Sequence, residues 1–145
     1  MTIKSATPEE AHELVSQGAV YVDVRSEQEY EQGHPPGALN VPIAHFGPAG
    51  MTPNPEFLSV MRAVFAPDSK LVIGCKAGGR SRKAAEVLEQ AGFTDLTDMT
   101  AGWDGSRDAF GRPLPGWSKR ALPVETGLPA GQRYADVKTR SAANG

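Results

Sequence analysis

The chain contains 145 residues, of which 15 are basic and 17 acidic, and its formal net charge at pH 7 is −2. A chain of this length is expected to form one domain that buries about two thirds of its unfolded surface. Its balanced charge argues against nucleic acid or another polyanionic surface as the partner. The single cysteine, Cys75, excludes an internal disulfide or dithiol pair and fits a reducing compartment.

The same composition gives no reason to expect a metal or a membrane. The three histidines, His12, His34 and His45, lack the spacing of metal ligands, and no cofactor is expected. The first residues form no apolar signal segment, and no apolar run is long enough to span a bilayer. We therefore expect a cytoplasmic protein without membrane contact.

The first part of the chain alternates helix and strand patterns. Thr7, Pro8 and Glu10 predict a helix that begins with a capping box and runs to about Gln17, where Gly18 ends it. Apolar β-branched runs and amphipathic spacing then predict a strand over 19–24, a helix over 27–32, a strand over 38–41 and a helix over 55–65.

The alternation continues as far as residue 99 and then stops. A strand is predicted over 71–75, a helix over 81–91 and a strand over 96–99. This spacing predicts an α/β fold with a parallel sheet, whose binding site lies at the carboxyl ends of the strands, where Asp23 and Cys75 fall. Residues 102–145 are rich in glycine, proline and polar side chains, and 138–145 is expected to fray.

Cys75 lies where an apolar strand meets a glycine-rich, basic turn. The stretch from Lys76 to Lys83 contains four basic residues and no acidic one. A free thiol near pKa 8.5 is only about 3% thiolate at pH 7. The positive end of the following helix stabilises a thiolate by at most about 2 kcal/mol, so Lys76 and Arg80 are expected to supply the rest. The alternative is a buried structural cysteine, which explains neither the glycine pair nor the basic cluster.

Two motifs resemble the rhodanese family of sulfurtransferases. The first is Val22-Asp23-Val24-Arg25-Ser26, continuing through Glu29-Tyr30 to Gly33-His34-Pro35-Pro36-Gly37-Ala38-Leu39-Asn40-Val41-Pro42, and the second is the loop Cys75-Lys76-Ala77-Gly78-Gly79-Arg80-Ser81. The resemblance implies a central five-stranded parallel sheet flanked by helices. It also implies a single rhodanese-like domain over 1–125, with 104–116 as an insertion and a partly flexible tail over 126–145.

The length of the second motif separates the relatives that share this fold. The loop from Cys75 to Arg80 spans six residues, as in the sulfur-transferring members that the chain resembles. Phosphatases and arsenate reductases of the fold carry one residue more, and the Cys-Gly-Ser/Thr-Gly-x-Thr loop of mercaptopyruvate-type enzymes is absent. The resemblance therefore implies thiosulfate-type chemistry, in which the Cys75 thiolate takes the outer sulfur and passes it to cyanide or a thiol. It implies a small anionic sulfur donor, and it is also compatible with a protein partner in a sulfur relay.

The resemblance also implies roles for the loop. The backbone N–H groups from Lys76 through Ala77, Gly78 and Gly79 to Ser81 would cradle a persulfide, and Arg80 would bind the anionic donor. For Lys76, direct catalysis and simple steering of anions remain equal alternatives.

Three residues of the first motif are expected to be structural. Asp23 should bond to backbone near the loop, Arg25 should pair with Glu29, and His34 should be a hydrogen-bonded loop histidine.

Two questions stay open at this level. The protein is either an enzyme, a non-catalytic rhodanese-like binding or regulatory module, or a redox sensor in which Cys75 oxidises to a sulfenic acid. The insertion over 104–116 either forms a wall around the site or packs on the back of the domain. In either arrangement Phe110 and Trp117 are expected to anchor it.

Overall fold

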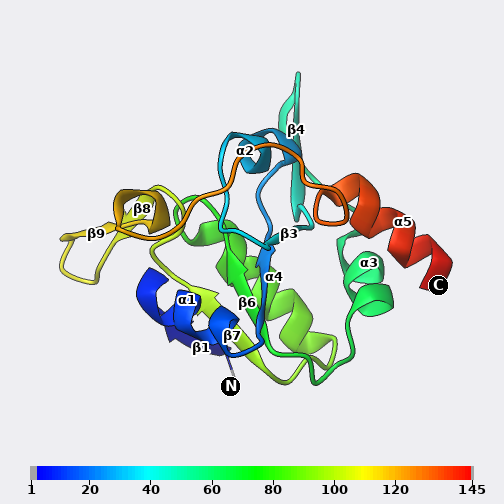
Figure 1. The fold of residues 1–145 in the computed structure, drawn as a ribbon, viewed down its shortest axis with the longest axis horizontal. Coiled ribbons are helices and arrows are strands. Elements are labelled where there is room, and N and C mark those ends of the chain that lie inside the picture. Colours follow the sequence, from blue (N-terminus) through cyan, green and yellow to red (C-terminus); the bar gives the residue numbers. More distant parts are fainter. Residues whose placement is uncertain (1–2, 145) are drawn as a thin grey trace.

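The computed structural model describes residues 3–144. Its central element is a five-stranded parallel sheet with the strand order β1-β7-β6-β2-β3 (Figure 1). This confirms the predicted α/β class. The elements of this core are β1 (Ile3–Ala6), α1 (Pro8–Ser16), β2 (Val20–Asp23), α2 (Glu27–Gln32), β3 (Leu39–Asn40), α3 (Phe57–Val64), β6 (Leu71–Gly74), α4 (Gly79–Gln90) and β7 (Leu96–Met99).

The strand register brings the candidate residues to one edge of the sheet. Asp23 is the partner of Gly74, and Ile73 is the partner of Asp98. Because all these strands are parallel, their carboxyl ends meet at the same edge, and Cys75 follows directly after β6.

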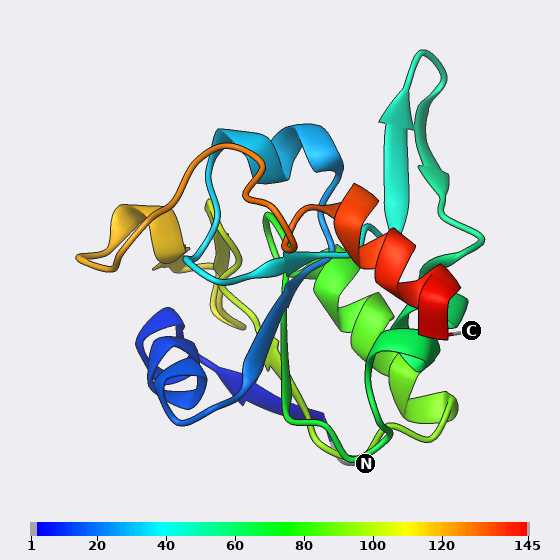
Figure 2. The same ribbon diagram turned by 45° about the vertical axis from the view of Figure 1, so that its right-hand side comes forward.

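Each face of the sheet packs against its own set of helices (Figure 2). One apolar cluster joins Val22 and Ile73 to side chains of α3, α4 and the C-terminal helix. The other joins Tyr21 and Val72 to Ala11 of α1 and to further buried residues. The alternation of neighbouring strand residues between the two faces explains why β2 and β6 read as continuous apolar runs.

The predicted helix start at Thr7 is confirmed in detail. The Thr7 hydroxyl accepts from the Glu10 backbone N–H at 3.1 Å, and the Glu10 carboxylate accepts from the Thr7 N–H at 2.8 Å. The first strand of the sheet, β1, is absent from the predicted elements. Its four residues include only Ile3 and Ala6 as apolar positions, too short a pattern to indicate a strand, and pairing with β7 creates it.

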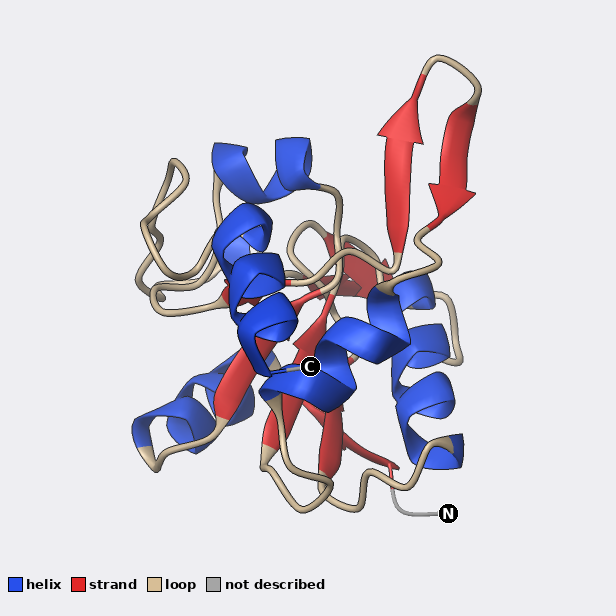
Figure 3. Ribbon diagram, turned by 90° about the vertical axis from the view of Figure 1, so that its right-hand side faces the viewer, coloured by secondary structure: helices blue, strands red, loops and turns tan. Residues whose placement is uncertain are grey.

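Two antiparallel hairpins extend from the core and were not predicted. The first joins β4 (Ala44–Gly47) to β5 (Gly50–Pro53) and projects away from the sheet (Figure 3). The second joins β8 (Gly105–Arg107) to β9 (Pro113–Pro115), within the segment expected to be an insertion.

The end of the chain differs from the expectation that 138–145 frays. After the short 3₁₀ turn η1 (Trp117–Lys119), the chain forms α5 (Tyr134–Asn144), which packs on α3. Val137 is fully buried, as Tyr134 nearly is. The chain is therefore helical as far as residue 144, where an irregular end was expected, and residue 145 lies outside the described residues. Burial against α3 stabilises a helix that its own sequence specifies only weakly.

Candidate active site

The thiol of Cys75 lies at the start of α4, almost completely buried at 1% exposure. Its Sγ accepts a hydrogen bond from the Gly78 backbone N–H at 3.1 Å. The loop thus directs a backbone N–H donor at the sulfur. The sulfur also lies at the N-terminal end of the 12-residue helix α4, where the helix dipole favours negative charge.

Only one member of the glycine pair has a conformation that requires glycine. Gly78 has φ of +99°, and a Cβ there would lie 2.7 Å from the Thr100 carbonyl oxygen. Gly79 has open space around it and no positive φ. The turn after β7 presses on the same loop, because a Cβ on Gly102 would lie 2.4 Å from the Lys76 carbonyl oxygen.

Ser81, the last residue of the loop, connects the thiol to a carboxylate. Cys75 Sγ donates to Ser81 Oγ at 3.4 Å, and Ser81 Oγ donates to Asp98 Oδ1 at 2.7 Å. The carbonyl of Gly78 lies 3.1 Å from the same hydroxyl. Burial raises the pKa of Asp98 despite the hydrogen bond from Ser81.

Arg80 makes a bidentate ion pair with Glu29, a partner that the sequence analysis assigned to Arg25. The Nη1 and Nη2 atoms of Arg80 donate to the two carboxylate oxygens at 2.7 and 2.9 Å. Burial opposes ionisation of Glu29, but the hydrogen bonds from Arg80 and Ser26 outweigh it and lower the pKa of Glu29 to about 2. The contact ties α2 to the start of α4.

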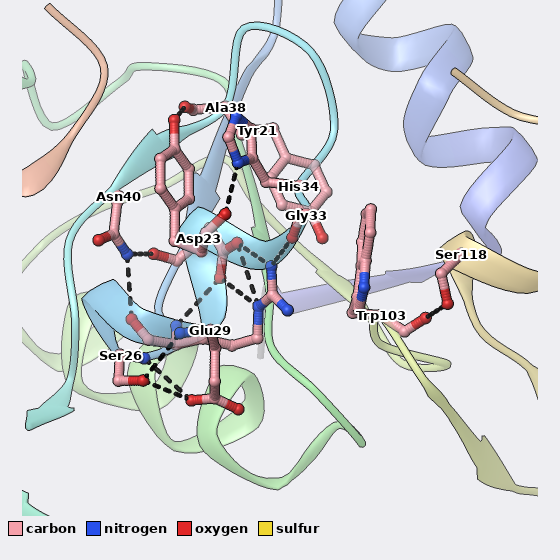
Figure 4. Close-up of polar contacts among 12 residues, drawn as sticks. Tyr21, Asp23, Ser26, Glu29, Gly33, His34, Ala38, Asn40, Trp103 and Ser118 are labelled. Carbon is pink, nitrogen blue, oxygen red and sulfur yellow. Dashed lines mark hydrogen bonds and ion pairs between the residues drawn. The ribbon is translucent and has the colours of Figure 1, made fainter. Parts of the chain in front are cut away.

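Arg25 instead pairs with Asp23, so the expected Arg25–Glu29 pair is wrong. Figure 4 shows the polar contacts around Asp23, Glu29 and Gly33. Arg25 Nη2 donates to Asp23 Oδ2 at 2.7 Å and to the Gly33 carbonyl at 2.6 Å, and its guanidinium lies 5.1 Å from the Trp103 ring centroid. Asp23 also accepts from the Arg25 backbone N–H at 3.0 Å, in agreement with its expected bond to backbone. Both side chains are at least 95% buried, as their side-chain exposures of 2% and 4% show.

His34 has the hydrogen-bonded environment that was predicted for it. It is fully buried, with Nδ1 2.7 Å from the Tyr30 carbonyl and Nε2 3.0 Å from Glu125 Oε1. Its ring stacks on the Tyr30 ring at 3.7 Å between centroids. These contacts hold the chain after α2 against residues near 125.

Acidic side chains pair with three of the four basic residues in the stretch 76–83. Besides Arg80, Lys76 lies 3.8 Å from Asp104, and Arg82 lies 3.4 Å from Glu86. Lys76 and Asp104 are about half exposed, so this pair contributes little energy. The site is therefore less positive than the local count of charges predicts.

Two hollows flank the ion pair of Arg80 with Glu29. On one side, a polar pocket of about 160 Å³ is lined by Arg25, Glu29, Gln32, Lys76, Trp103 and Asp104. On the other side, a largely apolar groove of about 360 Å³ lies between the β4–β5 hairpin, α3 and α4, with Arg80 and Lys83 on its rim. Arg80 thus borders the apolar groove, and its partner Glu29 lines the polar pocket.

The β8–β9 hairpin lies beside the loop that follows Cys75. Its residues share a hollow of about 560 Å³ with Ala77, and the Asp104 backbone N–H donates to the Lys76 carbonyl at 3.0 Å. Trp117 is buried, as expected of an anchor, whereas Phe110 is 83% exposed and anchors nothing.

Two kinds of site are absent from the part of the chain that the structure describes. No group of three or more His, Cys, Asp or Glu side chains within residues 3–144 could hold a metal ion. None of the helices in that range combines the length and apolar character that a membrane crossing requires.

Comparison with known proteins assigns the family. A model of the rhodanese-like domain matches residues 7–109, which is most of the chain, and this protein therefore belongs to the rhodanese-like domain family. The chain is 38% identical over 115 residues to thiosulfate sulfurtransferase 16, chloroplastic, of Arabidopsis thaliana, covering 79% of this chain and 87% of that protein. It is 29% identical over 126 residues to thiosulfate sulfurtransferase GlpE of Haemophilus influenzae, covering 87% and 98%.

A solved structure supports the same assignment. The crystal structure of Rv0390 from M. tuberculosis matches with a TM-score of 0.70 and 33% identity, covering 86% of this chain and 98% of that one. For three other plant relatives that it matches, this chain spans 57% of their length.

The roles of two carboxylates of the site were not predicted from the sequence. Glu29 was assigned to the wrong arginine, and Asp98 was not singled out. For Asp98 a signal existed, since it is an acidic residue inside the strand predicted over 96–99. For Glu29 there was none, because its partner is 51 residues away.

Proposed function

We propose that this protein is a sulfurtransferase that moves sulfane sulfur from thiosulfate, or from a persulfide donor, to a thiophilic acceptor. The observation that carries the proposal is the position of Cys75, with Sγ 3.1 Å from a backbone N–H donor in a six-residue loop at the start of α4. The names of the two sulfurtransferase relatives support it. The single cysteine suits a reducing compartment, and cytoplasmic residence is part of the proposal.

In the proposed reaction the Cys75 thiolate attacks the outer sulfur of thiosulfate. The sulfur–sulfur bond of thiosulfate breaks, sulfite leaves with the electron pair, and a Cys75 persulfide remains. Cyanide or a thiolate then attacks the outer persulfide sulfur, and the Cys75 thiolate is regenerated as the leaving group. Backbone N–H groups of the loop, from Lys76 to Ser81, cradle the persulfide charge.

The charged residues have separate roles in this proposal. Arg80 orders the loop through Glu29, and its remaining N–H donors face the anionic donor. Lys76, at 56% side-chain exposure, steers anions toward the site. Asp23 and Arg25 are structural in this proposal, because their ion pair packs the Arg25 guanidinium against the Trp103 ring.

The test is production of thiocyanate from thiosulfate and cyanide by the wild-type protein and by Cys75→Ser. Serine preserves the size of the side chain but cannot form a persulfide, so we expect loss of activity with an unchanged fold. Activity near wild type in the serine variant would refute the mechanism.

Mass spectrometry of protein purified without reductant separates the remaining alternatives. An additional sulfur on Cys75 supports transfer, whereas additional oxygen would support a redox sensor. An unmodified cysteine that also fails to react with thiosulfate would support a non-catalytic module.

A further inference from the structure

A buried carboxylate lies behind the thiol, connected to it by one hydroxyl. Asp98, Ser81 and Cys75 are 2%, 0% and 1% exposed. The Cys75 thiol donates to Ser81 Oγ at 3.4 Å, and the Ser81 hydroxyl donates to Asp98 Oδ1 at 2.7 Å. The three side chains therefore form a continuous hydrogen-bonded path from sulfur to carboxylate.

We propose that Asp98 accepts the proton of Cys75 through Ser81, so that the thiolate forms inside the protein without a base from solvent. The proposal rests on the proposed role of Cys75 as the nucleophile. The transfer starts from the Cys75 thiol and the Asp98 carboxylate. On transfer, the S–H bond breaks and its proton binds Ser81 Oγ, while the original Ser81 proton passes to Asp98 Oδ1. The net charge of the three groups stays −1, and Ser81 then donates to the thiolate.

The surroundings of Asp98 suit a proton acceptor. Burial raises its pKa above that of an ordinary aspartate. The charged groups of α4 that act on it are Arg82, which opposes this shift, and Glu86, which adds to it. The phenol of Tyr21, from β2, interacts with both ends of the path, but burial raises its pKa well above 10 and keeps it neutral.

The other charged group near the sulfur is Arg80, which interacts electrostatically with Cys75 while it binds Glu29. A thiolate next to a neutral Asp98 keeps this favourable interaction and avoids a second negative charge in a buried site. This arrangement also fits the partial loss of positive charge from the loop, because a proton that moves internally leaves the net charge of the site unchanged.

A scaffold role for Asp98 is the competing explanation. The Ser81 hydroxyl lies 3.1 Å from the Gly78 carbonyl, which is a second acceptor for its single proton. In that orientation Asp98 would remain a carboxylate and would only repel the thiolate.

The two explanations predict different pH profiles for the reactivity of Cys75. A thiol that loses its proton to solvent reacts about tenfold more slowly for each pH unit below its titration. With internal transfer, the thiolate population becomes independent of pH between the two titrations of the coupled pair. The profile then levels off over at least about one pH unit before it falls again.

The experiment measures the rate of Cys75 alkylation by iodoacetamide from pH 4.5 to pH 9. The reagent is uncharged, and Cys75 is the only cysteine. The variants are Asp98→Asn, which keeps the shape of the side chain, and Asp98→Ser, which also removes the carboxylate. Asp95→Asn is the control, since Asp95 precedes the same strand and binds only the exposed Lys4 among the ion pairs of the described residues.

We expect a profile with a level region in the wild type and in Asp95→Asn, and a single tenfold-per-unit fall in both Asp98 variants. The Asp98→Ser profile decides the matter if Asp98→Asn proves unfolded by circular dichroism. A single fall in the wild type, or a level region that survives in a folded Asp98 variant, would overturn the proposal. Alkylation needs no sulfur donor, so failure of the sulfurtransferase assay leaves this result interpretable.

Discussion

Replacing Glu29 by glutamine removes the charge that holds Arg80 while keeping the shape of the side chain. Glutamine also preserves the capping box of α2, in which residue 29 contacts Ser26. The substitution therefore isolates the ion pair between α2 and α4 from the helix cap.

The magnitude follows from the titration of Glu29. A pKa lowered from 4.5 to about 2 corresponds to at most ~3.4 kcal/mol of stabilisation of the folded state. The side chains of Glu29 and Arg80 are 26% and 23% exposed, so solvent screening reduces this value, and we expect a loss of about 1–2 kcal/mol at pH 7.

The sign of the pH dependence is fixed by the direction of the shift. Because folding lowers the pKa of Glu29, the stabilisation is complete above about pH 4.5 and is lost as the pH falls toward about 2. The difference between wild type and Glu29→Gln should therefore shrink steadily over this range.

Urea unfolding at pH 7, 5 and 3.5, followed by tryptophan fluorescence, measures the effect. Glu10→Gln is a matched control, because Glu10 closes the equivalent capping box of α1 and has no ion-pair partner among the described residues. Equal losses for the two variants at pH 7, or a Glu29→Gln difference that does not change with pH, would refute the reasoning.

Three further predictions concern the loop and its surroundings. Arg80→Ala should raise the KM for thiosulfate about tenfold or more, and Lys76→Ala by less, because only Arg80 is both partly buried and anchored; equal effects in steady-state assays would contradict this ranking. Insertion of one residue between Gly79 and Arg80 should weaken sulfur transfer, and the unaltered protein should not hydrolyse an aryl phosphate; efficient hydrolysis would disprove the argument from loop length. Replacement of 105–115 by a short Gly-Ser linker should increase the rate with bulky thiol acceptors relative to small ones, since the hairpin borders the loop at Ala77; an unchanged ratio in a stable variant would exclude a wall.

The sequence by itself determined most of the sheet and the position of the proposed nucleophile. Short apolar runs between helix patterns predicted β2, β3, β6 and β7, and the Thr7 capping box and the glycines indicated helix ends, because these signals are local. The parallel arrangement then required that Asp23 and Cys75 lie at one edge of the sheet.

Only the tertiary structure decided the electrostatics of the site. Counting along the chain gave four basic residues and no acidic one between 76 and 83. Folding brings Glu29 to Arg80, Asp104 to Lys76 and Asp98 to the thiol through Ser81. Charges act through distance in space, and none of these carboxylates belongs to the loop sequence. For the same reason α5 could not be predicted, since burial of Val137 rather than helix propensity stabilises it.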